Sequence, residues 1–221
     1  QFHKLSDRHI LVVETDMPYS DVLKVVILSD KIRKAGNELV SFMRKNYDQL
    51  IRTKKYRKLL KLYGSTKDKK KRKDLADQLN EMQKAYNVTW DYCRKSMIPI
   101  GKKYGIDAVF ALTKAEDVWR GIEKCLYGNG KAIHFSKYGE LPCIRAKQIN
   151  RGIPISVKDD RLQFKLGKTA FGIQVNDRFQ QDEVDAVLTY LAEPEIVGNK
   201  AVNTFIEDAY CIDTYRPCYA T

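Results

Sequence analysis

The sequence has no run of about 18 apolar residues, the length at which a helix becomes a candidate to cross a bilayer. Its first residues, Gln1 to Lys4, lack the charged and then apolar pattern of a secretory signal. These two absences favour a soluble protein that works inside the cell, and we expect it in the cytoplasm.

Cysteine and histidine are scarce. The five cysteines are Cys93, Cys125, Cys143, Cys211 and Cys218, and the three histidines are His3, His9 and His134. No two cysteines have the Cys-x-x-Cys spacing of a metal or redox site. An odd set of widely spaced cysteines is typical of reduced thiols rather than of a disulfide framework. A zinc site assembled from distant parts of the chain is the weaker alternative.

The motifs of common enzyme classes are missing as well. Gly167-Lys168-Thr169 is no phosphate-binding loop, because Leu162 stands where that motif needs a glycine. A Gly-x-Ser-x-Gly nucleophile elbow is also absent. Carboxylates occur in adjacent pairs at Glu116-Asp117, Asp159-Asp160 and Glu207-Asp208. Adjacent acids point in different directions, so we interpret the pairs as a helix start, a hairpin turn and a loop. We expect no catalytic residue and no metal site in this region.

Positive charge is what the sequence has in excess. Its 221 residues include 40 Lys and Arg and 28 Asp and Glu, which gives a formal net charge of +12. The cations are densest between Arg52 and Lys73, in RTKKYRKLLKLYGSTKDKKKRK, where Tyr56 and Tyr63 lie among them. Such charge neutralises phosphates and supplies most of the affinity for a nucleic acid. The stretch therefore predicts a polyanionic partner, with a hydrated helical surface as the alternative.

Hydrophobic periodicity predicts helices in the first part of the chain. After a short apolar strand at residues 8–14, apolar residues recur at steps of three and four from Val22 through Phe42 and Met43, which predicts a helix to about Tyr47. The same spacing continues over residues 50–63 and, after Gly64-Ser65-Thr66, towards Trp90. A further helix is expected with Thr113 as its cap and Gly128 as its end.

Beyond Gly130 the period changes from near four to near two. AIHF, IPISV, RLQFKL and FGIQV read as short strands, with Asp159-Asp160 as a hairpin turn. Residues 182–192 return to helical spacing before the last strands. Since a single early strand cannot be stable alone, we predict an α+β protein in which it joins the later strands and the helices are inserted between them.

The stretch AEDVWRGIEKCLYGNGKAIHFSKYGELPCIRAKQINRGIPI, followed by the hairpin DDRLQFKL, resembles TnpB, the transposon-encoded RNA-guided nuclease, and the type V CRISPR effectors related to it. In that family a helix with a central aromatic ends at a glycine turn. A short strand, a loop and the strands of an oligonucleotide-binding-like barrel follow. The corresponding places here are Trp119, residues 128–131, residues 134–137 and residues 146–153.

The resemblance implies a fold in which an oligonucleotide-binding-like β-barrel, the wedge, carries an inserted helical recognition lobe. Residues 1–18 would supply the first barrel strand, and residues 19–127 the lobe. Residues 128–221 would supply the rest of the wedge, with one inserted helix near 182–192.

In this family a RuvC-like domain cuts DNA. It needs an Asp in a D-x-G setting, a later Glu, a further Asp and usually a cysteine zinc ribbon, and none of these is found here. We therefore expect the chain to be the amino-terminal, non-catalytic region of an RNA-guided DNA endonuclease. Mg²⁺ would belong to the missing domain.

The partners implied are a guide RNA and a double-stranded target DNA, with no membrane, near the nucleoid of a bacterial or archaeal cell. By the resemblance, guide RNA would contact a barrel edge whose residues are Lys131, His134, Phe135, Lys137, Lys147 and Arg151. Phe135 would pack inward or stack on a base. The guide–target heteroduplex would contact the helical lobe at Arg52, Lys54, Lys55, Arg57 and Lys58. The short target-adjacent duplex would lie near Lys84, Tyr86 and Asn87.

Two alternatives stay open on the sequence. A nuclease-dead, RNA-guided transcriptional repressor would share this whole region and differ only in the part that follows. A basic helical module for an acidic partner or a membrane surface would use the same cations without any preference for RNA.

Overall fold

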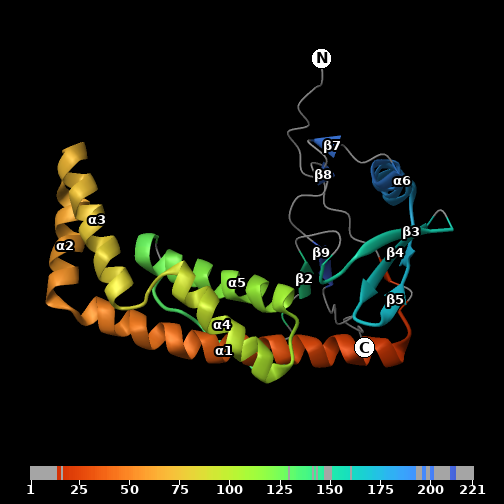
Figure 1. Cartoon of the computed structure of the whole chain (residues 1–221), viewed down its shortest axis with the longest axis horizontal. Coiled ribbons are helices and arrows are strands. Elements are labelled where there is room, and N and C mark those ends of the chain that lie inside the picture. The colour runs from red at the N-terminus through yellow and green to blue at the C-terminus, as the bar shows by residue number, and fades with distance from the viewer. Residues whose placement is uncertain are drawn as a thin grey trace, which may run out of the picture. The chain divides into compact units, whose positions relative to one another are not determined.

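The computed structural model of the chain describes residues 14–15, 17–128, 130–140, 142, 144–146, 151–159, 161–192, 196–197, 200–201 and 210–212. The described residues fall into two compact units (Figure 1). The helical unit comprises residues 26–144, and the β unit comprises residues 14–25 together with residues 145–212.

The helical unit contains five helices: α1 (Tyr19–Arg52, whose first turns count with the β unit), α2 (Lys54–Ser65), α3 (Lys69–Ala85), α4 (Trp90–Tyr104) and α5 (Ala108–Tyr127). Figure 1 shows α4 and α5 lying along α1, while α2 and α3 form a hairpin that stands away from the end of α1. In the described part of the chain no helix is both long and apolar enough to span a bilayer.

Helix α1 supplies one side of the core. Ile32, Ala35, Leu39 and Met43 are buried at the three- and four-residue steps that predicted the helix. Burying each of the larger of these side chains stabilises the fold by about 1.5–3 kcal/mol. Phe42, which was counted with this face, is half exposed instead, because the helix turns it about 100° away from Met43.

The helix boundaries differ from the prediction at two places. The first helix runs to Arg52, past the predicted end near Tyr47, and only Thr53 separates it from α2. The last helix of the unit begins at Ala108 and is capped by Asp107, whose carboxylate accepts the amide N–H of Val109 at 2.8 Å. The prediction that Thr113 caps this helix is wrong. Thr113 is buried inside the helix, and its hydroxyl donates to the Val109 carbonyl oxygen at 2.7 Å.

The β unit is centred on a three-stranded antiparallel sheet, in which β4 (Arg161–Leu166) lies between β3 (Ile155–Lys158) and β5 (Thr169–Phe171). Both turns are two residues long, because Lys158 pairs with Arg161 and Leu166 pairs with Thr169. Asp159 has φ +50° and Gly167 has φ +61°, the left-handed conformation that such tight turns favour. The predicted turn at Asp159 is confirmed.

The remaining strands form three two-stranded sheets among the described residues. Strand β1 (Glu14–Thr15) pairs with β6 (Ile173–Gln174), as expected for an early strand that joins later ones; residues 8–13 of the predicted strand lie outside the described residues. The others are β2 (Ile144–Ala146) with β9 (Tyr210–Ile212), and β7 (Ile196–Val197) with β8 (Lys200–Ala201).

Helix α6 (Arg178–Ala192) packs on the sheet, and its Val184 forms a buried hydrophobic cluster with Ile155 and Leu162 of the sheet. The α+β class is therefore confirmed. The described strands form separate small sheets, and among them no closed barrel is present.

Cys93 gives a chemical test of the helical core. Its side chain is fully buried, its Sγ donates to the Ala115 carbonyl oxygen at 3.6 Å, and burial raises the pKa of the thiol to about 12. Since the thiolate is the reactive form, we expect iodoacetamide at about pH 8 to leave Cys93 unmodified until the protein is unfolded. Half-buried Cys125 should react sooner. Mass spectrometry of the two cysteine peptides checks this, and equal labelling rates in the folded protein would contradict it.

Candidate nucleic-acid interface

Residues 130–137, which carry four of the predicted RNA-binding side chains, follow the end of α5. The amide N–H groups of Gly128 and Gly130 both donate to the Lys124 carbonyl oxygen, at 3.1 and 2.9 Å, and so close the last turn of the helix. The predicted end at Gly128 is confirmed. The predicted strand is wrong: the described residues between 130 and 137 have no strand pairing, and they belong to the helical unit.

Polar side chains of α1 replace the missing strand partner. The Asn37 amide donates through Nδ2 to the Ser136 carbonyl oxygen and accepts the Ser136 N–H through Oδ1, both at 2.9 Å. Two turns earlier on α1, the buried Ser29 hydroxyl donates to the Pro142 carbonyl oxygen at 2.6 Å. With Ile133 buried, these bonds hold residues 130–142 against the helices. The alternating pattern of residues 131–137 in the sequence could not predict that Asn37 supplies these hydrogen bonds.

The basic and aromatic side chains of this segment face outward. Lys131, His134 and Lys137 are exposed, and Phe135 is 45% exposed, so the expectation that Phe135 packs inward is wrong. The Arg44 guanidinium carbon lies 5.9 Å from the centre of the Phe135 ring, which is a cation–π distance. The exposed ring therefore remains available for stacking on a planar group.

A second arginine–aromatic pair lies on the same side of α1. The Arg33 guanidinium carbon is 5.5 Å from the centre of the Tyr138 ring, and that ring is 92% exposed. Arg33 itself is buried and held by Asp30 at 2.7 Å. Hydrogen bonds from Lys34 and Arg33 lower the pKa of the Asp30 carboxyl. Arg33, Arg44 and Tyr138 were not predicted as site residues, because only the fold brings α1 beside residues 135–138.

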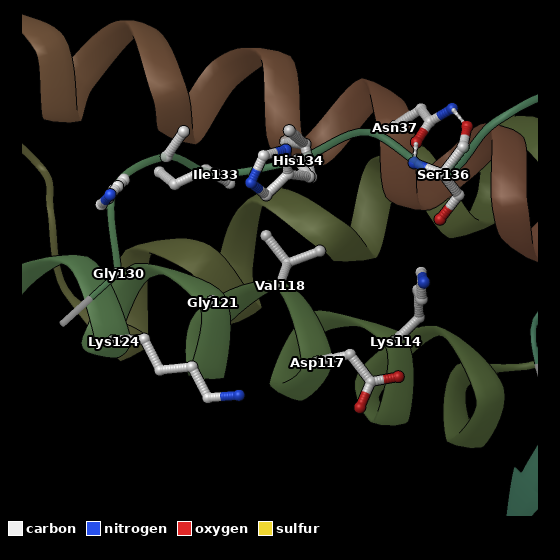
Figure 2. Close-up of a pocket in the computed structure, with 13 residues that line it drawn as sticks. Asn37, Lys114, Asp117, Val118, Gly121, Lys124, Gly130, Ile133, His134 and Ser136 are labelled. Atoms are coloured by element: carbon white, nitrogen blue, oxygen red, sulfur yellow. Dashed lines mark hydrogen bonds between the residues drawn. The ribbon is translucent and has the colours of Figure 1, made fainter. Parts of the chain in front are cut away.

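A pocket of about 380 Å³ lies between α1, α5 and residues 130–136 (Figure 2). Lys114, Asp117, Gly121 and Lys124 line it from successive turns of α5. Figure 2 shows the side chain of His134 between the α1 and α5 ribbons, with Val118 beneath it. We call this space the α1–α5 pocket. It was not predicted, because its walls come from three segments that are far apart in the sequence.

The other two predicted RNA-binding residues lie elsewhere. Arg151 is exposed and belongs to the β unit, and Lys147 lies outside the described residues. Four of the six predicted residues thus share one segment of the helical unit.

The predicted heteroduplex-binding cations lie on the α2–α3 hairpin and the end of α1 that leads into it. Residues 52–73, here called the cationic stretch, contain twelve of the 40 Lys and Arg residues and one of the 28 acids, Asp68. All twelve cations are exposed, including the predicted Arg52, Lys54, Lys55, Arg57 and Lys58. Twelve cations against one acid give the cationic stretch a net charge of +11, compared with +12 for the whole chain.

The cations of this stretch differ from many cations on the neighbouring helices in having no acidic partners among the described residues. Among the described residues none of the twelve forms an ion pair with Asp or Glu, whereas cations on α1, α3 and α4 do. Those ion pairs are Lys24–Asp21, Arg33–Asp30, Lys34–Asp30, Arg44–Asp48, Lys84–Glu81, Arg94–Asp91, Lys95–Asp91 and Lys103–Glu38. The unpaired charge must be balanced by mobile ions or by a bound polyanion.

The start of α3 sharpens this contrast. Asp68 caps the helix by accepting the N–H groups of Lys70 and Lys71 at 2.9 and 3.3 Å. Lys69 to Lys73 then place five cations in the first turns, where the helix dipole favours negative charge. A phosphate bound at this end would reduce the repulsion between these five cations and the helix dipole, which the single carboxylate of Asp68 offsets only in part.

The two tyrosines of the cationic stretch have different roles. Tyr56 is buried, accepts a hydrogen bond from Gln83 Nε2 at 3.4 Å, and has its pKa raised by burial. Gln83 also accepts the Tyr127 hydroxyl at 2.7 Å, which ties the hairpin to the end of α5. The Arg72 guanidinium carbon lies 4.7 Å from the centre of the Tyr63 ring, a cation–π distance. Tyr56 is thus a packing residue, and Tyr63 supports a surface cation.

Lys84, Tyr86 and Asn87, predicted to approach the target-adjacent duplex, lie at the base of the hairpin. Lys84 pairs with Glu81 at 2.9 Å, and this bond raises the pKa of Lys84. The Tyr86 hydroxyl accepts the Thr53 hydroxyl at 3.1 Å. Asn87 has φ +56°, and its carbonyl oxygen accepts Asn46 Nδ2 at 3.5 Å. These contacts hold the base of the hairpin together, which is a structural role for Tyr86 and Asn87.

Among the residues that the structure describes, no three His, Cys, Asp or Glu side chains cluster closely enough to hold a metal ion. Comparison with protein-family models, with curated proteins and with solved structures finds no match to this chain. Function must therefore be argued from the site itself.

Proposed function

We propose that this chain is the guide-RNA and target-DNA binding region of an RNA-guided DNA endonuclease of the TnpB and type V CRISPR kind. The observation that carries the proposal is the cationic stretch: twelve exposed cations on the hairpin and the end of α1 that leads into it, none of them paired with an acid in the described residues. Several cations on α1 and α4 are neutralised by neighbouring carboxylates. A surface that keeps its charge unpaired is suited to a polyanion.

The hairpin would act on the nucleic-acid backbone. Each lysine or arginine that neutralises a phosphate releases a condensed counterion, and this release drives binding without reading a base. A guide–target heteroduplex is recognised through the shape and charge of its backbone, which is the mode that a lysine-rich helical surface allows.

Residues 131–138 would form the second contact, with the guide RNA. Their exposed cations are joined by the rings of Phe135 and Tyr138, each beside an arginine of α1. Exposed rings backed by cations stack on unpaired bases. The oligonucleotide-binding-like wedge that the resemblance implies would be built from the β unit, and the recognition lobe from the helices.

The cutting chemistry of this family belongs to a RuvC-like domain that uses Mg²⁺. No metal cluster is found among the described residues, so we assign no catalytic step to them. The proposed place of action is the nucleoid of a bacterial or archaeal cell.

A competition experiment tests the proposal. Fluorescence anisotropy would follow a labelled RNA–DNA heteroduplex on the full chain, between about 0.05 and 0.2 M salt. We expect binding that weakens steeply with salt, and displacement by unlabelled heteroduplex or structured RNA more readily than by heparin of matched charge. Equal displacement by heparin would favour the basic module for an acidic partner, and absence of binding at low salt would refute the proposal.

A further inference from the structure

The α1–α5 pocket combines cations with an apolar wall. Lys124, Lys131 and His134 line it, and in the described part of the chain their side chains have no hydrogen-bond or ion-pair partner. Val40, Val118 and Ile133 line the same space. Its volume of about 380 Å³ lies within the roughly 300–1,000 Å³ of pockets that bind small molecules, and such pockets likewise combine apolar surface with a few polar groups.

We propose that the α1–α5 pocket binds a single nucleotide, with its phosphate on the lysines and its base against the apolar wall and the His134 ring. The shared chemistry is a phosphate ester joined to a flat, partly apolar ring. It has two possible sources: a free mononucleotide, or an unpaired or terminal nucleotide of a strand held by the protein. The second source rests on the proposed function, whereas the first does not.

The charge of the lining selects a phosphate. Lys114, Lys124 and Lys131 contribute three cations, and Asp117 is the one acid among the residues that line the pocket. Lysine binds phosphate as a mobile point charge with three donors, and charge-assisted bonds of this type are about twice as strong as neutral ones. The surplus of cations makes the pocket attractive to a dianion and unattractive to a neutral ligand.

The shape of the pocket admits a base beside the phosphate. A side-chain Cβ added at Gly121 would meet no atom within 4 Å, so the wall of α5 is open at that turn. Gly121 lies between Lys124 and Asp117, one helical turn from each, and Val118 lies beside it on the same face. The open turn is thus flanked by a cation on one side and by apolar surface on the other. A bare phosphate would leave that apolar surface unused.

Isothermal titration calorimetry of the full chain tests the pocket, with AMP, adenosine and inorganic phosphate as probes. We expect AMP to bind at least about tenfold more tightly than either adenosine or phosphate, because only AMP uses both walls. Short oligonucleotides with a 5′-phosphate or a 5′-hydroxyl separate the two sources. A preference for the phosphorylated end at matched length supports a strand terminus, and equal binding with tight AMP supports a free nucleotide.

Two variants separate the pocket from the hairpin. Gly121→Leu should fill the open turn and weaken AMP about tenfold or more, without touching a cation and with a better helix former in place of glycine. Lys124→Ala combined with Lys131→Ala should weaken AMP by a similar factor, because two of the three cations are removed. Gly121→Leu should keep heteroduplex binding to the hairpin within about twofold, since the cationic stretch is unchanged. The double lysine variant is compared by its AMP affinity alone, because Lys131 also belongs to the proposed RNA contact.

The outcomes distinguish this inference from the proposed function. The nucleotide pocket would be overturned if AMP bound no more tightly than phosphate, or if Gly121→Leu left the AMP affinity unchanged. Neither result would bear on nucleic-acid binding by the hairpin. AMP binding that follows these expectations in a protein that does not bind heteroduplex would support a free nucleotide and would remove the proposed function. Circular dichroism of each variant confirms that it is folded.

Discussion

Neutralising four cations of α2 should abolish most nucleic-acid binding. The variant replaces Lys54, Lys55, Arg57 and Lys58 by glutamine; all four are exposed. Each cation that no longer neutralises a phosphate lowers the slope of log affinity against log salt by about 0.9, so the four replacements reduce it by up to about 3.6. Near 0.1 M salt we expect the affinity for a heteroduplex to fall by roughly a hundredfold or more. Anisotropy titrations at several salt concentrations measure both quantities.

The fold should be unaffected by these changes. Glutamine is nearly as good a helix former as lysine and arginine, and exposed substitutions of this kind usually change the free energy of unfolding by less than about 0.5 kcal/mol. Removing like charges from one hairpin also reduces repulsion. A thermal melt that matches the unchanged protein would show that the weaker binding does not come from unfolding.

A matched control uses cations that have acidic partners. Lys34, Arg94, Lys95 and Lys103 are between 48% and 66% exposed and pair with Asp30, Asp91 or Glu38. Replacing these four by glutamine changes the net charge by the same amount, but at positions where the cation is already neutralised. We expect the affinity to fall by only a few fold. Equal decreases in the two variants would mean that net charge alone, and not the hairpin, controls binding.

Gly130→Ala should destabilise the helical unit. A Cβ at Gly130 would lie 2.8–2.9 Å from the backbone of Lys124 and Cys125, closer than real Cβ contacts. Neither the helix end nor the segment can move cheaply, because the Gly130 N–H is bonded to the Lys124 carbonyl oxygen. We expect a loss of about 1–3 kcal/mol in the free energy of unfolding, measured by urea denaturation.

Gly121→Ala is the matched control for this change. It makes the same substitution on α5, where the new methyl group meets no atom within 4 Å. Since glycine inside a helix costs roughly 0.5–1 kcal/mol relative to alanine, this variant should be more stable than the unchanged protein. Opposite signs for the two variants support the close turn at Gly130. Similar signs would contradict it.

The sequence predicted the helical unit well where one physical signal dominated. Burial on one side of α1 follows the three- and four-residue spacing of Ile32, Leu39 and Met43, because a helix that packs on one face must repeat that way. The concentration of charge in residues 52–73 was also readable, since only Asp68 lies within that stretch. The absence of ion pairs could be seen only in the structure, because Asp74 and Asp77 follow Lys70 and Lys73 on α3 at the four-residue spacing of helical ion pairs.

The prediction failed where a side chain took over the role of a backbone partner. Residues 131–137 have a short alternating pattern that fits a strand, but the Asn37 amide supplies the two hydrogen bonds that a neighbouring strand would provide. Threonine is a common capping residue, but here Asp107 caps the helix in place of Thr113, because its carboxylate accepts the Val109 N–H of the first turn. Lys84, Tyr86 and Asn87 could be placed at the base of the hairpin only after Thr53 and Asn46 were known to lie beside them. Such competition between local partners depends on three-dimensional proximity.

The chain enters and leaves the α2–α3 hairpin at almost the same point. Thr53 and Tyr86 are 33 positions apart and share a hydrogen bond of 3.1 Å, and Gln83 and Asn87 contact the neighbouring helices close to them, so the arm is attached at its base. Helical turns could be added to or removed from the two arms together without moving either attachment residue. A change in the length of the two arms would therefore leave the packing of the body formed by α1, α4 and α5 as it is.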